Sequence, residues 1–210
     1  MNYTLYGARG SGSAAIEMAL RAAEQPYRLV SAASWEPGPG LEALRQVNPL
    51  AQIPTLVLGD GTVLTESAAI LIHLGLTHSS AALLPAASGT RALALRGLVF
   101  LAANCYAAVS VSDYPERWTT ARGSAAHGRV RTAARAQLHR DWEVFADTIA
   151  PVTVMAEATP GALAFLTVVV SQWSGARQHL QTARPDFHAW LLRAEAHPRL
   201  AGTLAEHRSG

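Results

Sequence analysis

The most constraining feature of this chain is an Ile-Pro step that directly precedes a short apolar segment, Pro54 to Leu58. Pro54 has no backbone N–H, so a strand that begins there cannot be an ordinary central strand at that residue. We expect the Ile53-Pro54 bond to be cis, which would turn the amide and carbonyl of Ile53 outward, where an extended peptide can pair with them. The sequence therefore predicts a peptide-binding edge at Ile53, with an ordinary edge-strand start as the alternative.

A helix is expected to begin shortly afterwards, at Thr65-Glu66-Ser67. Thr65 is a good N-cap residue, and the free N–H groups of a helix N-terminus suit a carboxylate. Glu66, in the same turn, can accept an ammonium group. A plain capped helix gives the same signals. Together with the expected edge, these groups predict a ligand with a peptide-like middle and a zwitterionic end, a shape that glutathione has. The expected binding residues are Gln52, Ile53, Pro54, Glu66 and Ser67.

The segment from Asn48 to His73 resembles the second half of the thioredoxin-like domain of cytosolic glutathione transferases, with Asn-Pro, Ile-Pro, a strand, and Glu-Ser before a helix. In plan the resemblance covers the whole chain, strongly over residues 1–78 and loosely after that. It implies a thioredoxin-like α/β domain at 1–78, a linker at 79–90, an all-helical domain at 91–210, and a homodimer. Strands are expected at Tyr3 to Tyr6 and Tyr27 to Ala32, with a helix from about Ser13 to Glu24 between them.

Composition and charge exclude several classes of protein. The chain has 210 residues, of which 50% are hydrophobic and 15% charged, as is ordinary for a well-buried globular protein. A net charge of +2 is too small to indicate a nucleic-acid partner. The first residues show no secretory signal, and the longest apolar run, Leu163 to Val170, is far shorter than the roughly 18 residues that a membrane span requires. We therefore expect a soluble, cytoplasmic protein that does not contact a membrane.

The loop after the first expected strand, Gly7 to Ser13, lacks the cysteine that thioredoxin-like proteins use for their own thiol chemistry. Cys105, the single cysteine, falls among apolar residues of an expected helix and should be inert core. Any thiol chemistry must then belong to the ligand. The glycines of this loop do not have the Gly-x-Gly-x-x-Gly spacing of a dinucleotide site.

In the family that this chain resembles, the group that activates the thiol lies near the start of the first helix, where N–H groups and the helix dipole favour a thiolate. The resemblance implies Ser11 as the first candidate, Ser13 as the second and Tyr6 as the third. Ser13 is equally well placed as a plain N-cap. Lowering a thiol pKa by about two pH units takes roughly 2.7 kcal/mol, which a hydroxyl and a helix N-terminus can supply. No metal is required, and the eight histidines show no ligand spacing.

Helical periodicity dominates after residue 90. Between two long expected helices, Pro115 should interrupt the helix, and aromatic residues cluster there with charges. In a transferase, Tyr114 and Trp118 would cover an apolar substrate; a packed helix–helix corner is the alternative. The arginines from 117 to 140 suit either an anionic substrate or a solvated helix face. The family's Ser/Thr-x-x-Asp capping box is replaced by Gly161 and Ala164, which indicates a divergent member.

These features predict a glutathione transferase-like enzyme that activates the thiolate of bound glutathione for attack on a small electrophile. Two alternatives stay open. One is a glutathione-dependent isomerase or lyase, and the other is a non-catalytic glutathione-binding or interaction protein on the same fold.

Overall fold

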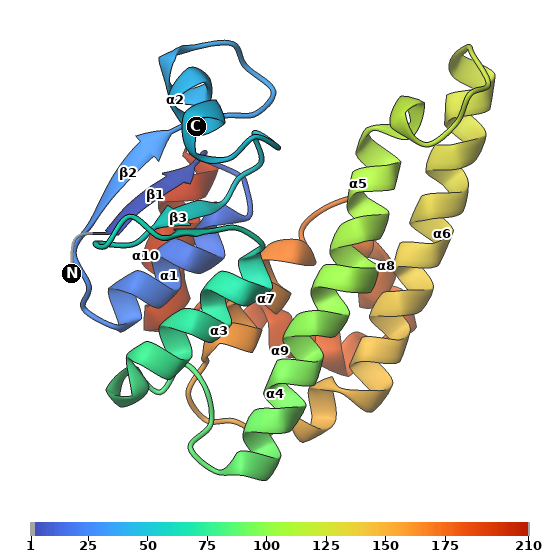
Figure 1. Cartoon of the computed structure of the whole chain (residues 1–210). Helices are drawn as coiled ribbons and strands as arrows, with labels where there is room; N and C mark the ends of the chain where they lie inside the picture. Colours follow the sequence, from blue (N-terminus) through green and yellow to red (C-terminus); the bar gives the residue numbers. More distant parts are fainter. Residues whose placement is uncertain (1–2, 210) are drawn as a thin grey trace.

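The computed structural model describes residues 3–209. Residues 1–2 of the expected first domain and residue 210 of the expected second domain lie outside the described residues. A small α/β half is followed by a helical half (Figure 1), which confirms the predicted fold class. The expected strands and first helix are present, with ends that differ by one or two residues. The α/β half contains β1 (Tyr3–Gly7), α1 (Ser13–Ala22), β2 (Tyr27–Ser31), α2 (Pro39–Val47), β3 (Thr55–Val57), β4 (Val63–Leu64) and α3 (Ser67–Thr77).

The four strands form one mixed sheet in the order β2-β1-β3-β4. Strand β1 runs parallel to β2 and antiparallel to β3, and β3 runs antiparallel to β4. The Ile53-Pro54 bond is cis, as predicted. The alternative of an ordinary edge strand is wrong, because β3 (Thr55–Val57) lies between β1 and β4, while the pairing of the Ile53 backbone with a peptide stays a prediction. Pro54 lies just before Thr55, the first residue of the ladder, so its missing N–H removes no ladder hydrogen bond.

Strand β1 is buried on both faces of the sheet because alternate side chains enter different clusters. Tyr3 and Leu5 pack into the large core that α1 and α3 share with the helical half. Tyr6 points to the opposite face, where Leu41 and Leu44 of α2 form a smaller cluster. The sheet is therefore a buried layer that holds the loops at its ends in fixed positions.

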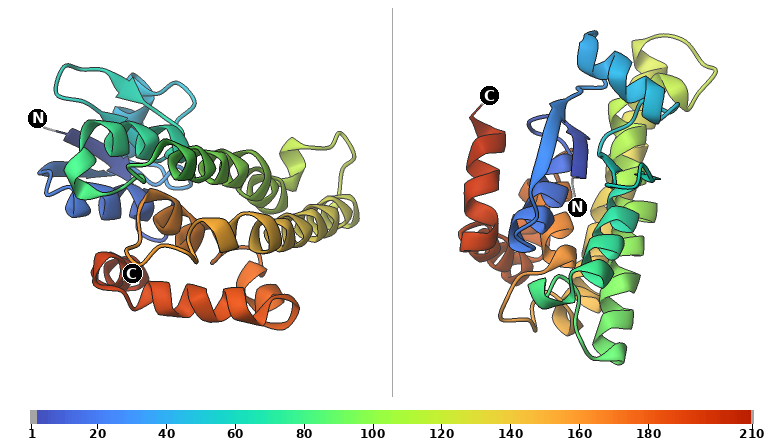
Figure 2. Two further views of the ribbon diagram at one scale, coloured as in Figure 1. Left: turned by 90° about the horizontal axis from the view of Figure 1, so that it is seen from below. Right: turned by 60° about the vertical axis from the view of Figure 1, so that its left-hand side comes forward.

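The helical half is organised around α7, whose nine residues are all buried. Helix α1 packs against both α7 and α10, which joins the two halves through one core. Figure 2 shows α10 lying alongside the α/β half, on the side away from α4 and α5. The elements of this half are η1 (Ser79–Ala81), α4 (Ser88–Phe100), the π-helical η2 (Leu101–Tyr106), α5 (Ala107–Asp113), η3 (Pro115–Arg117), α6 (Ser124–Thr148), η4 (Ala150–Val152), α7 (Ala162–Val170), α8 (Ala176–Ala183), α9 (Pro185–Glu195) and α10 (Pro198–Arg208).

Elements α4, η2 and α5 form one continuous helical segment, Ser88–Asp113. An 18-residue window of this segment has a mean hydropathy of 1.7, so the segment is long and apolar enough to cross a membrane, which the uninterrupted apolar runs of the sequence did not predict. Length and composition alone do not separate a span from a core helix. Leu98, Leu101 and Cys105 of this segment are buried in the large core, and burial raises the pKa of the Cys105 thiol. The cysteine is thus an unreactive core residue, as expected.

The start of α7 explains why the capping box is missing. The first N–H of this helix, on Ala162, donates at 2.8 Å to the carbonyl of Leu83, which lies in the connection between η1 and α4. Arg199 of α10 holds the same region by donating to the carbonyls of Pro160 and Ala81. A Cβ at Gly161 would lie 2.6 Å from the Leu83 oxygen, too close for any side chain. A backbone carbonyl therefore replaces the capping side chain, and glycine is the residue that admits it.

Restoring the box should consequently harm the protein. We expect Gly161→Ser to lower the free energy of unfolding by about 1–3 kcal/mol, because the new Cβ meets backbone that cannot move aside easily. The matched control is Gly202→Ser in α10, where an added Cβ meets nothing within 4 Å. This control should be neutral or slightly stabilising, since serine forms helix better than glycine. The free energy of unfolding of both variants is measured with urea. A Gly161→Ser protein that is more stable than the parent would contradict the packing argument.

Candidate functional site

One cavity of about 760 Å³ lies between the two halves of the molecule. The α/β half lines it chiefly with residues 10–12 before α1, 50–54 before β3 and 65–67 at the start of α3. The helical half lines it with residues of η2, α5 and η3, together with Leu166 and Trp173. Three loops at one end of the sheet therefore face a wall of helices. The residues predicted from the sequence as binding groups, Gln52, Ile53, Pro54, Glu66 and Ser67, all line this cavity.

The loop that carries Gln52, Ile53 and Pro54 is held by a buried asparagine. The Asn48 amide donates to the Gln52 carbonyl at 3.1 Å and to the Thr55 hydroxyl at 3.0 Å. The Thr55 hydroxyl donates to the same carbonyl at 2.8 Å. Both side chains are buried, so the loop is pinned from beneath. In the sequence, Asn48 stands only as the first residue of a motif, and its structural role emerges from these contacts.

Helix α3 begins one position later than expected. Glu66, not Thr65, is its N-cap, and no side chain caps the helix. Glu66 has φ 63° and ψ 112°, a region that non-glycine residues seldom occupy and that is often found at functional sites. This left-handed residue separates Thr65 from the helix, which is why the Thr65 cap prediction is wrong. Ser67 is the first helical residue and faces the cavity with free helix N–H groups around it.

The loop before α1 is held together by its own serines. The Ser11 hydroxyl donates to the Ala8 carbonyl at 2.7 Å, and the Ser13 hydroxyl lies 3.2 Å from the same oxygen. The two hydroxyls are 3.0 Å apart, and Ser11 Oγ also accepts from the Ser13 N–H. Ser13 is the first residue of α1 rather than its N-cap, because Gly12 occupies that position. Ser11 lines the cavity and Ser13 is fully buried behind it.

The last helix reaches this same loop. The Gly10 N–H donates to His207 Nδ1 at 3.1 Å, and His207 Nε2 lies 2.8 Å from Glu17 Oε1. Glu17 is a buried carboxylate of α1 that also accepts from the Tyr27 hydroxyl at 3.0 Å. An imidazole that accepts at Nδ1 and donates at Nε2 links the loop, α1 and α10. The sequence did not predict this contact, which joins residues 197 positions apart.

Of the other residues predicted to belong to the site, Tyr114 lines the cavity, whereas Trp118 and Tyr6 do not. Tyr114 lines the cavity, and the Arg117 guanidinium lies 4.0 Å from the centre of its ring, as in a cation–π pair. Trp118 lies outside the lining and is 59% exposed. Tyr6 is also outside it, because its side chain packs toward α2 on the far face of the sheet.

Two aromatic side chains that the sequence did not single out occupy the cavity wall. Tyr106 of η2 and Trp173 after α7 pack edge to face, with ring centres 5.5 Å apart and planes at 69°. The Tyr106 hydroxyl lies directly against Gly12, where a Cβ would overlap it. Burial, and secondarily the charge of Glu66, raises the pKa of Tyr106 to about 12. A tyrosine within an apolar helical stretch looks the same in the sequence whether or not it lines a site, so the sequence did not predict this role for Tyr106.

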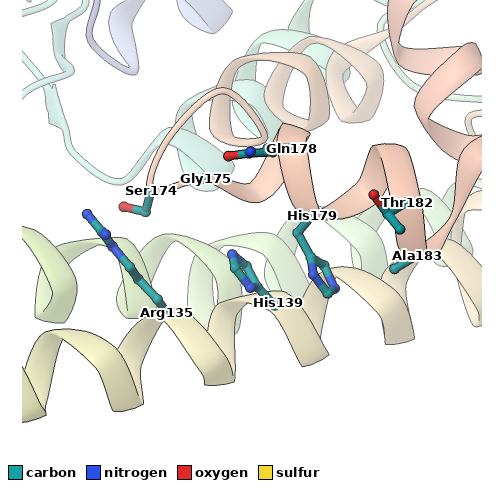
Figure 3. Close-up of a pocket in the computed structure, with 8 residues that line it drawn as sticks. All are labelled: Arg135, His139, Ser174, Gly175, Gln178, His179, Thr182 and Ala183. Carbon is teal, nitrogen blue, oxygen red and sulfur yellow. The ribbon is translucent and has the colours of Figure 1, made fainter.

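A second cavity, of about 410 Å³, lies between α6 and α8 and shares no residue with the first. Figure 3 shows its side chains, with the rings of His139 and His179 facing one another; the rings stack 4.2 Å apart. His179 is paired with Glu143 at 2.7 Å, while burial and, to a lesser degree, His179 lower the pKa of His139. Within residues 3–209 no three His, Cys, Asp or Glu side chains are placed to hold a metal ion. We therefore assign the candidate site to the larger cavity.

Comparison with known proteins gives a family for part of the chain. Residues 13–76 match the family described as glutathione S-transferase, N-terminal domain. The chain is 38% identical over 115 residues to an uncharacterized GST-like protein, YncG, of Escherichia coli (strain K12), an alignment that covers 54% of this chain and 56% of that one. It is 36% identical over 83 residues to a probable maleylacetoacetate isomerase of Caenorhabditis elegans, covering 40% of this chain and 37% of that one. The alignments thus span about half or less of these relatives.

The fold matches over nearly the full length. A glutathione transferase homologue from Sulfitobacter, crystallised with bound glutathione, superposes with a TM-score of 0.80 and covers 97% of each chain. The sequences are 21% identical, so this likeness speaks for the fold.

Proposed function

We propose that this chain is a member of the glutathione S-transferase superfamily, that it binds glutathione in the larger cavity, and that it activates the thiol for attack on a small electrophile. The match of residues 13–76 and the likeness of the fold support this proposal. One observation carries the proposal. The predicted binding groups of two segments, together with the catalytic candidate Ser11 of a third, line a single cavity, and aromatic side chains of the helical half face them across it.

In this arrangement the ligand lies along the ends of the loops. The N-terminus of α3 at Ser67 binds the carboxylate of the γ-glutamyl end, and the Glu66 carboxylate binds its ammonium group. The backbone of Ile53 pairs with the peptide-like middle. The thiol then points toward the N-terminus of α1, where residues 10–12 line the cavity.

The chemistry requires that the thiol lose its proton near neutral pH. A free thiol has a pKa of about 8.5, so only a few per cent is ionised at pH 7. The positive end of the α1 dipole and hydrogen-bond donors aimed at sulfur favour the thiolate. Sulfur then forms a bond to the electrophilic carbon, and the leaving group departs with its electron pair. The side chains of Tyr114, Leu166 and Trp173 offer the apolar wall for the electrophile.

A glutathione-dependent isomerase is the second candidate, and the similarity to a probable maleylacetoacetate isomerase favours it. It would use the same bound thiolate, adding to a carbon–carbon double bond and leaving again after rotation. Calorimetric titration with glutathione, followed by turnover assays on aryl halides, epoxides, peroxides and cis-enones, separates the two. Binding with no turnover of any of these would point to a non-catalytic binding protein.

We expect Glu66→Ala and Ser67→Ala each to weaken glutathione binding by about 1–3 kcal/mol, the cost of losing a hydrogen bond to a charged group. Glu36→Ala, which removes an exposed carboxylate outside the lining, is the matched control and should bind as the parent does. Titration calorimetry measures all three. If both site variants bind glutathione normally and remain folded, the proposed γ-glutamyl site is wrong.

Assembly and location are part of the same proposal. We expect a soluble, cytoplasmic protein, and the resemblance implies a homodimer. Light scattering of the purified protein measures the mass that tests the homodimer.

A further inference from the structure

The start of α1 has a gap where an activating side chain is expected. The loop presents Gly10, Ser11 and Gly12 to the cavity, and two of these have no side chain. The Ser11 hydroxyl is already bonded to the Ala8 carbonyl at 2.7 Å. The Ser13 hydroxyl lies behind it, fully buried, and contacts the same carbonyl. Both hydroxyls thus hold the loop in shape, and neither is free to turn toward a ligand without breaking that contact.

The helical half fills this gap. The Tyr106 hydroxyl lies where a side chain at Gly12 would stand. Within the part of the chain that the structure describes, no hydrogen bond to that hydroxyl is made by another protein group. Tyr106 ends the π-helical stretch Leu101–Tyr106, and such stretches are frequent at functional sites. The edge-to-face contact with Trp173 holds its ring in place.

The charge state of this hydroxyl suits a donor. Burial raises its pKa to about 12, with the negative charge of Glu66 acting in the same direction. At neutral pH the tyrosine therefore carries its proton and can donate it in a hydrogen bond. The other charged groups that line the cavity are Arg45, Asp113 and Arg117.

We propose that Tyr106, supplied by the helical half, donates the hydrogen bond that stabilises the thiolate of the bound ligand, in place of a side chain from the loop before α1. The inference rests on the proposed function. The thiol proton leaves to solvent, and the Tyr106 O–H then points at the sulfur anion. Sulfur forms its bond to the electrophilic carbon while the leaving group takes the electron pair. Tyr106 keeps its proton throughout.

The decisive variant is Tyr106→Phe, which keeps the ring and its contact with Trp173 and removes only the hydroxyl. The ultraviolet absorption of the thiolate, followed against pH in the glutathione complex, gives the thiol pKa directly. We expect this pKa to rise by about one to two pH units, which lowers the rate at neutral pH roughly tenfold to a hundredfold. The rate should recover at alkaline pH. Glutathione affinity at neutral pH should stay within about threefold, because the thiol form binds as before.

The controls separate this role from a structural one. Tyr114→Phe removes a hydroxyl from the same cavity and should leave the thiol pKa unchanged. Gly12→Ala places a methyl group where the Tyr106 hydroxyl lies and should raise the thiol pKa as Tyr106→Phe does. The two changes together should do little more than either alone, because both remove one interaction.

The outcomes are distinguishable. A Tyr106→Phe protein that binds glutathione and titrates like the parent would overturn the role of Tyr106 and leave the proposed function intact. A parent protein that binds no glutathione would overturn both.

Discussion

Replacing Trp142 with alanine should lower the free energy of unfolding by about 3–5 kcal/mol, the range measured for large aromatic residues in protein cores. Trp142 is fully buried on α6, and its ring centre lies 5.5 Å from that of Phe145 and 6.3 Å from that of Phe187 on α9. Alanine would leave a void between these helices that rigid neighbours cannot close. For a chain of this size we expect the midpoint of thermal unfolding to fall by about 10 °C or more.

Two further variants sharpen this prediction. The Trp142 indole N–H is buried, and no partner for it lies within residues 3–209. Trp142→Phe should therefore cost much less than the alanine variant, since it keeps most of the volume and removes an unpaired donor. Val144→Ala, on the same helix, removes a side chain that is 46% exposed and should have little effect. Equal losses for Val144→Ala and Trp142→Ala would show that the aromatic cluster is not the core of this half.

The second large effect is expected at the ion pair of Arg177 and Glu195. Their side chains are only 18% and 15% exposed, and the charged atoms lie 2.7 Å apart. Arg177, on α8, also donates to the Ser171 hydroxyl at 2.7 Å and to the Val168 carbonyl at 3.1 Å, which ties α8 to the end of α7, while its pair with Glu195 adds α9. Burial lowers the pKa of Arg177, and the Glu195 carboxylate opposes this. The guanidinium is therefore held in a poorly hydrated place by one carboxylate.

Glu195→Gln keeps the shape of the side chain and removes its charge, so the buried guanidinium loses its counter-ion. We expect the free energy of unfolding, measured with urea, to fall by about 3 kcal/mol. This is the lower end of the range for a broken buried ion pair, because Arg177 keeps its hydrogen bonds to the Ser171 hydroxyl and the Val168 carbonyl. Asp147→Ala removes one partner of the exposed pair with Arg184 and should change stability far less. Arg177→Met should cost less than Glu195→Gln, because Glu195 keeps its contact with Arg208. A harmless Glu195→Gln substitution would mean that water reaches Arg177 in solution.

The parts of the site that the sequence predicts are those in which the signal is local. An Ile-Pro step before a strand and a Glu-Ser pair before a helix each occupy a few consecutive residues. The antiparallel pair of strands β3 and β4 lies between them and sets the distance that separates them. Gln52, Glu66 and Ser67 therefore reach one cavity as expected from the chain alone. The same reasoning erred at Thr65, because a capping preference says nothing of the left-handed backbone that Glu66 adopts.

The parts that the sequence misses are set by packing between distant segments. Tyr106 and Gly12 are each unremarkable in their own surroundings, and their meaning comes from the contact between them. From the sequence alone Gly161 indicates a lost cap, because the Leu83 carbonyl that replaces the cap belongs to another segment. Pattern reasoning can place an element and its faces, but it cannot tell which distant atom will fill a gap.

The contact between His207 and the loop at Gly10 sets an order of events during synthesis. The ribosome makes residues 10–12 well before α10, so this loop cannot take its complete set of contacts until α10 has emerged. A nascent chain that carries only the α/β half therefore lacks His207, which in the complete fold links the Gly10 N–H to the Glu17 carboxylate. For this protein, the site loop takes its full set of contacts only after both halves of the molecule have been made.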